Sequence, residues 1–121
     1  MAATGGGRSL AALANGTVVL VRFPFSDLSG TKLRPAIVLA QAGRGDIILC
    51  QITSQPYTDS SAIEVLPTDL DAGSLNRTSY VRPTKLFTAN DSIVARQVGQ
   101  LSADRFHAVI DALVGILESS R

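Results

Sequence analysis

The sequence has one cysteine, one histidine and no tryptophan among its 121 residues. One cysteine cannot form an intrachain disulfide or a cysteine-based zinc site, and Cys50 lies in an apolar strand pattern typical of a small core residue. A Ser-His-Asp hydrolase and a two-histidine ribonuclease both need a histidine beside the nucleophile. The single histidine, His107, falls just off the apolar stripe of a predicted C-terminal helix. The sequence also has no glycine-rich phosphate loop, carboxylate pair or metal-ligand cluster, so we expect no cofactor and no metal.

A strong excess of charge of either sign is also absent. Eleven basic and ten acidic side chains leave a formal net charge of +1, which excludes nucleic-acid binding driven by a basic field over the whole molecule. Residues 76–96 form a local basic patch, with Arg77, Arg82, Lys85 and Arg96 against Asp91 alone. No run is apolar enough to span a membrane, and a lone cysteine fits a reducing compartment. We therefore expect a cytoplasmic protein without a membrane partner.

The organisation of the chain follows from its composition and its apolar pattern. Residues 1–14 are rich in alanine and glycine, which predicts a flexible N-terminal tail, and residues 15–121 predict a single domain. β-Branched and alternating apolar residues predict strands at 17–23, 35–41, 47–53 and 62–66, and one or two more within 79–87 and 93–98. Residues 69–78 predict a loop or a short helical turn.

The periodicity changes near the C-terminus. From Phe106 to Leu117 apolar residues recur at helical spacing, and Ser102 precedes them as a predicted N-cap. Several short strands followed by one amphipathic helix predict a mainly β (α+β) fold, a small barrel with the C-terminal helix packed on it.

The segment Lys32-Leu33-Arg34-Pro35 directly precedes the apolar run 36–39. Pro35 restricts Arg34 to an extended conformation, and residues i and i+2 of an extended segment point the same way. Lys32 and Arg34 can therefore reach into one site, where an ammonium and a guanidinium suit a phosphate. Taken alone, such a pair is more typical of a solvated loop with a surface ion pair, for example to Asp27.

A predicted hairpin relates Arg34 to Thr53. The strands that contain them are joined by the short turn 43–46 and should pair, so the start of one lies beside the end of the other. This pairing makes Arg34 and Thr53 neighbours. Thr53 alone would be an ordinary strand residue that caps its own turn.

A second group of cations follows in the basic patch. Arg82 precedes Pro83 and is thereby held extended. Arg82 and Lys85 fit contacts to phosphates, and they fit equally well edge-strand charges that discourage aggregation.

Five segments occur in the order and spacing of one toxin family: Gly16-Thr17-Val18, Lys32 to Leu39, Ile52-Thr53-Ser54, Ser79-Tyr80-Val81-Arg82 and Gly99-Gln100-Leu101-Ser102. From about Gly16 to the C-terminus the chain resembles the MazF/PemK toxins of bacterial toxin–antitoxin modules. The resemblance implies an SH3-like β-barrel, a homodimer, and metal-independent, sequence-specific cleavage of single-stranded RNA. It also implies inhibition by a small MazE-like antitoxin whose disordered tail fills the RNA groove.

The resemblance also implies roles for individual residues. In this family the ribose 2′-OH attacks the phosphate and leaves a 2′,3′-cyclic phosphate and a 5′-OH. The family's catalytic arginine and threonine match Arg34 and Thr53. Arg34 would stabilise charge on the pentacoordinate phosphate, and Thr53 would orient the 2′-OH or bond a non-bridging oxygen. The remaining predicted RNA contacts are Lys32, Arg82 and Lys85, with Ser54 and Ser79 as secondary donors.

Two departures from the family pattern favour this arginine–threonine chemistry. Thr84 stands where some members carry an aspartate, and the loop 26–31 lacks a histidine that others use. Two other classes of function stay open: a toxin resembling CcdB, which binds DNA gyrase without RNA chemistry, and a non-catalytic SH3-like module that only binds a partner.

Overall fold

The computed structural model describes residues 13–23, 32–55 and 59–121. The strands are β1 (Thr17–Phe23), β2 (Lys32–Gly43), β3 (Asp46–Thr53), β4 (Ile63–Val65), β5 (Leu70–Gly73), β6 (Ser79–Asn90) and β7 (Val94–Leu101). Two 3₁₀ turns, η2 (Pro67–Asp69) and η3 (Asp91–Ile93), precede β5 and β7, and the helix α1 (Ala103–Glu118) follows β7.

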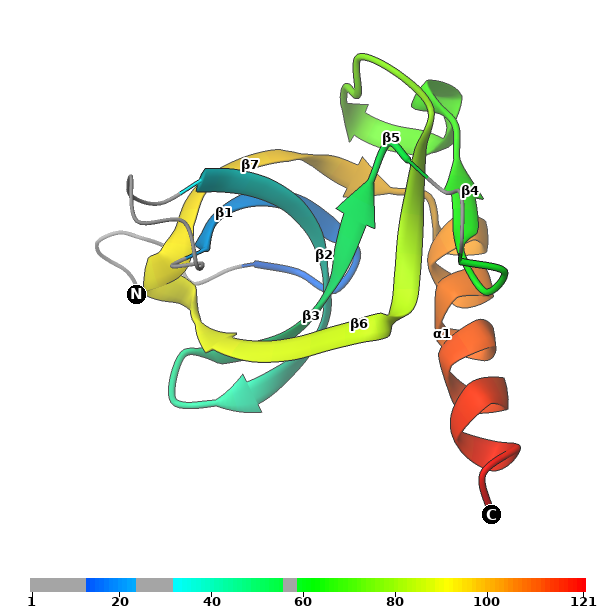
Figure 1. Cartoon of the computed structure of the whole chain (residues 1–121). Helices are drawn as coiled ribbons and strands as arrows, with labels where there is room; N and C mark the ends of the chain where they lie inside the picture. Colours follow the sequence, from blue (N-terminus) through cyan, green and yellow to red (C-terminus); the bar gives the residue numbers. More distant parts are fainter. Residues whose placement is uncertain (1–12, 24–31, 56–58) are drawn as a thin grey trace.

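The seven strands form one antiparallel sheet in the order β4-β6-β3-β2-β1-β7-β5. The sheet curls into a half-barrel, and α1 stands outside the curl beside β4 and β6 (Figure 1). The predicted mainly β fold with a C-terminal helix packed on a curled sheet is confirmed.

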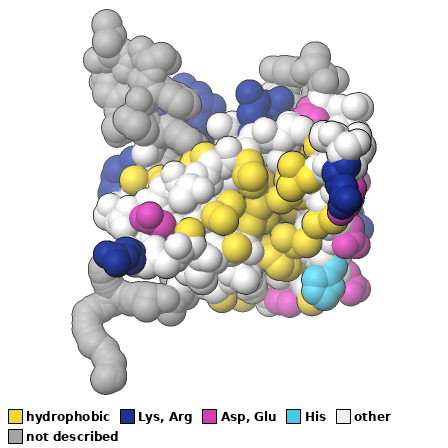
Figure 2. Space-filling view, turned by 90° about the horizontal axis from the view of Figure 1, so that it is seen from below, with side chains coloured by type: hydrophobic (Ala, Val, Ile, Leu, Met, Phe, Trp, Pro, Cys, Tyr) yellow, Lys and Arg dark blue, Asp and Glu magenta, His cyan; other side chains and the backbone are white. Residues whose placement is uncertain are grey.

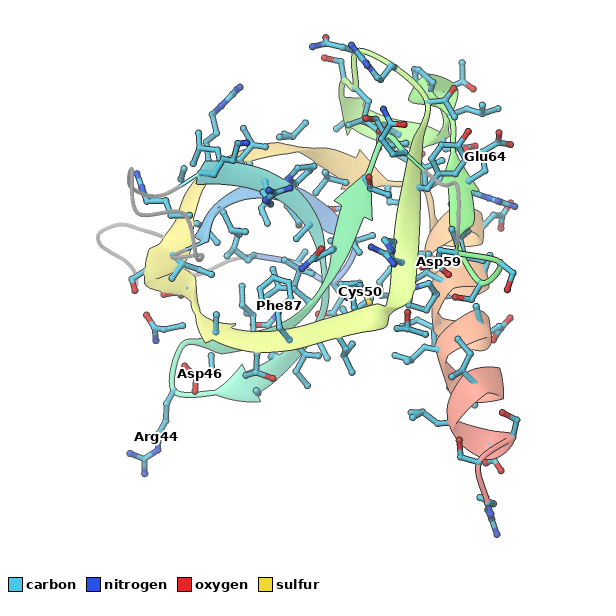
Figure 3. All side chains as sticks on the ribbon, viewed as in Figure 1. Arg44, Asp46, Cys50, Asp59, Glu64 and Phe87 are labelled. Atoms are coloured by element: carbon cyan, nitrogen blue, oxygen red, sulfur yellow. The ribbon has the colours of Figure 1, made fainter. Side chains whose placement is uncertain are left out.

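Alternation along the strands gives the sheet two apolar faces. The inner core lies inside the curl and consists of Val19, Val21, Ala36, Val38, Ile47 and Leu49. Phe87 packs against this core and points into the space that the sheet encloses (Figure 3). The outer core contains Val18, Ile37, Cys50, Val81 and Val109 of α1, so the helix covers the other face. With both faces apolar, the middle of β2, residues 36–39, is buried, while both ends of the strand are exposed.

The helix begins where its capping residue predicts. The Ser102 hydroxyl accepts a hydrogen bond from the backbone N–H of Arg105 at 3.3 Å, which confirms Ser102 as the N-cap. Val109 is the helix residue that is fully buried, and Phe106, Ile110 and Leu113 pack beside it. Within the described residues, no helix is long and apolar enough to cross a membrane.

The structure differs from the sequence predictions in one strand. Residues 70–73, predicted as loop or helical turn, form β5, because Gly73 lies opposite Gly99 and allows the backbones of β5 and β7 to approach closely.

Two residues at the end of the predicted tail contact the sheet. Leu13 and Ala14, which the composition groups with the tail, lie against the sheet: the Gln41 amide donates to the Leu13 carbonyl at 2.8 Å, and the Thr17 hydroxyl donates to the Ala14 carbonyl at 2.7 Å. Residues 1–12 of the predicted tail lie outside the described residues.

Candidate functional site

β2 and β3 form the predicted hairpin, and their register runs from the turn to Ala36 opposite Gln51. Arg34 and Thr53 each lie two residues beyond this last pair, on different strands at the same end of the hairpin. On its other side Arg34 lies opposite Val21 of β1. Because Arg34 alternates with Ala36 and Thr53 with Gln51, both share the inner face of the sheet, at an end where the apolar core gives way to polar residues.

The cation pair at the start of β2 has the predicted extended backbone. β2 begins at Lys32, which lies opposite Phe23 of β1, so Lys32 and Arg34 lie on the same face two residues apart. Both side chains are exposed. Two positive charges are thereby held along one strand at the rim of the curl, a spacing that suits a phosphodiester backbone.

A bulge in β6 carries Arg82 to the same face. Arg82 lies opposite Gln51, whereas the next residue of β3, Cys50, lies opposite Leu86. The three residues 83–85 therefore have no partner on β3, and β6 bends sharply at this corner (Figure 1). Lys85 lies within the bulge and is exposed. Arg82, ahead of the bulge, lies on the inner face across Gln51 from Ala36, two residues along β2 from Arg34.

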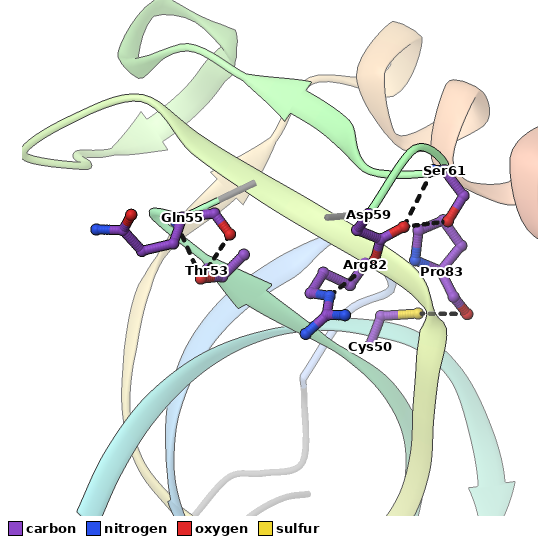
Figure 4. Close-up of polar contacts among 7 residues, drawn as sticks. All are labelled: Cys50, Thr53, Gln55, Asp59, Ser61, Arg82 and Pro83. Carbon is purple, nitrogen blue, oxygen red and sulfur yellow. Dashed lines mark hydrogen bonds and ion pairs between the residues drawn. The ribbon is translucent and has the colours of Figure 1, made fainter. Parts of the chain in front are cut away.

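Arg82 forms an ion pair that the sequence does not predict. Its Nε donates to Oδ2 of Asp59 at 2.8 Å (Figure 4). Oδ1 of the same carboxylate accepts from the backbone N–H of Ser61 at 3.0 Å and from its hydroxyl at 2.6 Å. The hydrogen bond from Arg82 holds the pKa of Asp59 below its ordinary value of 3.8, with a further contribution from Ser61. Asp59 is therefore ionised at neutral pH.

The ion pair makes stability depend on pH in a defined direction. The pKa of Asp59 is lowered in the folded protein, so its contribution to the free energy of unfolding is fully present above the unfolded value of 3.8 and is lost as pH falls through the folded value. Urea unfolding should show that Asp59→Asn has a lower free energy of unfolding than wild type at pH 7. The difference between the two free energies should become smaller between about pH 5 and about pH 3. A difference that stays constant with pH would contradict the assignment of an ionised Asp59.

The candidate hydroxyls occupy different surroundings. Thr53 Oγ1 accepts from the backbone N–H of Gln55 at 3.0 Å, so this side chain caps the turn after β3 (Figure 4). Ser54 is exposed just beyond β3. Ser79 is buried opposite Val65, and its hydroxyl donates to the Arg77 carbonyl at 3.2 Å. It shares the outer face with Val81, so the structure does not bring Ser79 to the inner-face group.

Two residues join the site that sequence reasoning did not select. Gln51 lies on the inner face, opposite Arg82 on one side and opposite Ala36 on the other, and is half-buried. Its signal in the sequence is alternation, since it follows Ile47 and Leu49 on one face of β3. Asp59 has only a weak signal, an Asp-x-Ser turn pattern, because its partner is 23 residues away.

Cys50 is close to this corner but is not a nucleophile. The side chain is fully buried, its Sγ lies 3.8 Å from the Pro83 carbonyl oxygen, and burial raises the pKa of the thiol to about 12. Iodoacetamide at neutral pH should therefore leave the native protein unmodified and alkylate it in urea, as measured by intact mass. Rapid alkylation of the folded protein would contradict this burial.

The described residues contain no group of three or more His, Cys, Asp or Glu side chains that could hold a metal ion. The inner-face group instead combines Lys32, Arg34 and Arg82 with the amide of Gln51 and the hydroxyl of Thr53. Such a set can bind and polarise phosphates through charge and hydrogen bonds.

Comparison with known proteins assigns this architecture. Residues 14–117 match the family described as PemK-like, MazF-like toxin of type II toxin–antitoxin system. The toxin MazF-mt6 of Mycobacterium tuberculosis is 19% identical with a TM-score of 0.66, and the match covers 84% of this chain and 96% of that one. A MazE–MazF structure from Deinococcus radiodurans is 22% identical with a TM-score of 0.68, covering 89% and 98%.

A third similar structure is a mycobacterial endoribonuclease in complex with its cognate antitoxin. It is 17% identical with a TM-score of 0.63, and the match covers 86% of this chain and 91% of that one. No curated protein matches the chain. At these identities the solved structures establish a shared fold, and the family match covers nearly all of the described domain.

Proposed function

The chain belongs to the family of PemK-like, MazF-like toxins of type II toxin–antitoxin systems, and we propose that it is a sequence-specific endoribonuclease that cleaves single-stranded RNA without a metal ion. The observation that supports the proposal is that Lys32, Arg34 and Arg82 lie on one face of the sheet, the face that also carries Thr53. The net charge of the chain is close to zero, yet three cationic side chains lie on this one face of the half-barrel. Their positions suit successive phosphates of a single strand.

The proposed reaction is transesterification at phosphorus. The ribose 2′-oxygen forms a bond to the phosphorus and loses its proton, while the bond to the 5′-oxygen breaks and that oxygen gains a proton. The products are a 2′,3′-cyclic phosphate and a 5′-OH end. Arg34 carries a positive charge and hydrogen-bond donors, so it acts by stabilising the charge that develops on the phosphate oxygens.

The other residues of the group bind and orient the strand. Thr53 bonds the 2′-OH or a non-bridging oxygen, and its turn-capping hydrogen bond from Gln55 leaves the hydroxyl fixed in position. Lys32 and Arg82 bind flanking phosphates, with Lys85 and Ser54 further along the rim. Binding that depends on a few phosphate contacts should weaken as salt rises.

We also propose a cognate antitoxin and a homodimer. An acidic antitoxin tail could occupy the same row of cations as RNA and so block it, which fits the antitoxin complex among the similar structures. Large apolar side chains stay exposed on β6 and α1, including Leu86, Val114 and Leu117. Figure 2 shows apolar side chains gathered over one continuous area of the surface, a feature typical of interfaces between subunits.

A metal-free cleavage assay tests the proposed function. Purified, antitoxin-free protein is incubated with a long single-stranded RNA in the presence of EDTA, and the cleaved ends are mapped. Discrete cuts that carry 5′-OH ends are expected, and their positions give the recognition sequence. Well-folded protein that leaves the RNA intact would reject the ribonuclease and direct attention to gyrase binding.

A further inference from the structure

Asp59 lies between β3 and β4 and holds Arg82 through one hydrogen bond. Oδ2 accepts from Arg82 Nε at 2.8 Å, while Oδ1 is occupied by the N–H and the hydroxyl of Ser61. The Asp59 side chain is only 10% exposed. Because both of its oxygens are engaged and it is turned away from solvent, this carboxylate is a fixed support and cannot itself meet a ligand.

Among the described residues, the guanidinium of Arg82 is held along one edge. Its Nε is taken by Asp59, and no described residue accepts a hydrogen bond from its two Nη groups. Figure 4 shows both Nη atoms directed away from Asp59, over the sheet. The side chain keeps 28% exposure. Four N–H groups are thus presented in a fixed fork, the geometry that binds two oxygens of a phosphate.

An ion pair that served stability alone would favour a different geometry. Arginine and a carboxylate bind most strongly when two parallel N–H groups meet both oxygens. Here Asp59 uses one oxygen for Arg82 and gives the other to Ser61. The arrangement therefore restricts the direction of the guanidinium while it leaves the binding edge open.

We propose that Asp59, fixed by Ser61, is a positioning residue that orients the Nη groups of Arg82 toward a phosphate of the RNA substrate. This inference rests on the proposed function. The carboxylate touches neither the substrate nor the reacting atoms, and it acts only through Arg82. Its loss should therefore matter only while Arg82 is present.

A double-mutant cycle tests this dependence. RNA cleavage is measured for wild type, Asp59→Asn, Arg82→Ala and the double variant, with KM and kcat determined separately. Asp59→Asn should raise KM about tenfold and change kcat less than about threefold, and it should have no further effect on KM when Arg82 is already alanine. Asp111→Asn, an exposed position on α1, is the matched control for the change in charge and should match wild type.

A second variant covers the case in which Asp59→Asn fails to fold. Ser61→Ala keeps both charges but removes one of the two bonds to Oδ1, so it should raise KM about threefold, again only when Arg82 is present.

Each outcome decides the inference. Additive effects in the double variant, or a KM for Asp59→Asn equal to that of the Asp111→Asn control, would overturn the positioning role while the ribonuclease function stands. Tighter RNA binding by Asp59→Asn would also overturn it, because Asp59 would then compete with RNA for Arg82. Wild-type protein that neither cleaves nor binds RNA would reject the function itself, and the inference with it.

Discussion

Replacing Arg34 with alanine should lower the rate of RNA cleavage about 10²–10³-fold while the protein stays folded. The loss is large because a preorganised donor aimed at the developing charge acts mainly in the transition state. Arg34 is exposed at the start of β2, so its truncation opens no cavity in either core. Single-turnover cleavage of a short RNA that contains the mapped site measures the rate, and urea unfolding reports the fold.

Arg44→Ala is the matched control for this variant. It removes the same charge from the same hairpin, but at the turn between β2 and β3, and Figure 3 shows Arg44 pointing away from the sheet. It should cleave at close to the wild-type rate. Equal losses in the two variants would mean that net charge, and not position, drives the reaction. A folded Arg34→Ala protein that cleaves at the wild-type rate would show that the assignment of Arg34 is wrong.

Short-range patterns predict much of this fold. The alternation along β3 assigns its two faces, the turn at 43–46 predicts its pairing with β2, and Ser102 marks the start of α1. These features depend on residues that are close together in sequence. β5 depends on Gly73 meeting Gly99 in β7, and its own sequence, Leu-Asp-Ala-Gly, has little strand character. No local pattern could predict it.

The candidate site divides in the same way. The placement of Arg34 and Thr53 at the same end of the sheet, on one face, follows from the register and alternation of one hairpin. Arg82 lies on this face because of the three-residue bulge in β6. Its ion pair is with Asp59, which is 23 residues away in the sequence. For Ser79 a usable signal was present: it alternates with the apolar Val81, so it belongs to the buried face and not to the face of Arg82.

We expect a single added methyl group to destabilise the protein most where β5 pairs closely with β7. Gly73 has a φ of +77°, and a Cβ there would overlap the Val98 carbonyl and the Cα of Gly99. All of these neighbours are backbone atoms, so relief requires β5 to separate from β7. Gly73→Ala should lower the free energy of unfolding by about 2–4 kcal/mol, from the strain of a positive φ and from overpacking. Urea unfolding measures the change.

Gly43→Ala separates these two causes. Gly43 also has a positive φ, +94°, but apart from its chain neighbours no described residue has an atom within 4 Å of the position its Cβ would take. Gly43→Ala therefore introduces the backbone strain without the overlap, and it should lower the free energy of unfolding by only about 1–2 kcal/mol. The difference between the two variants isolates the cost of separating β5 from β7. Equal costs would mean that this edge of the sheet opens freely, and that the close approach of Gly73 to Gly99 adds nothing to the stability of the protein.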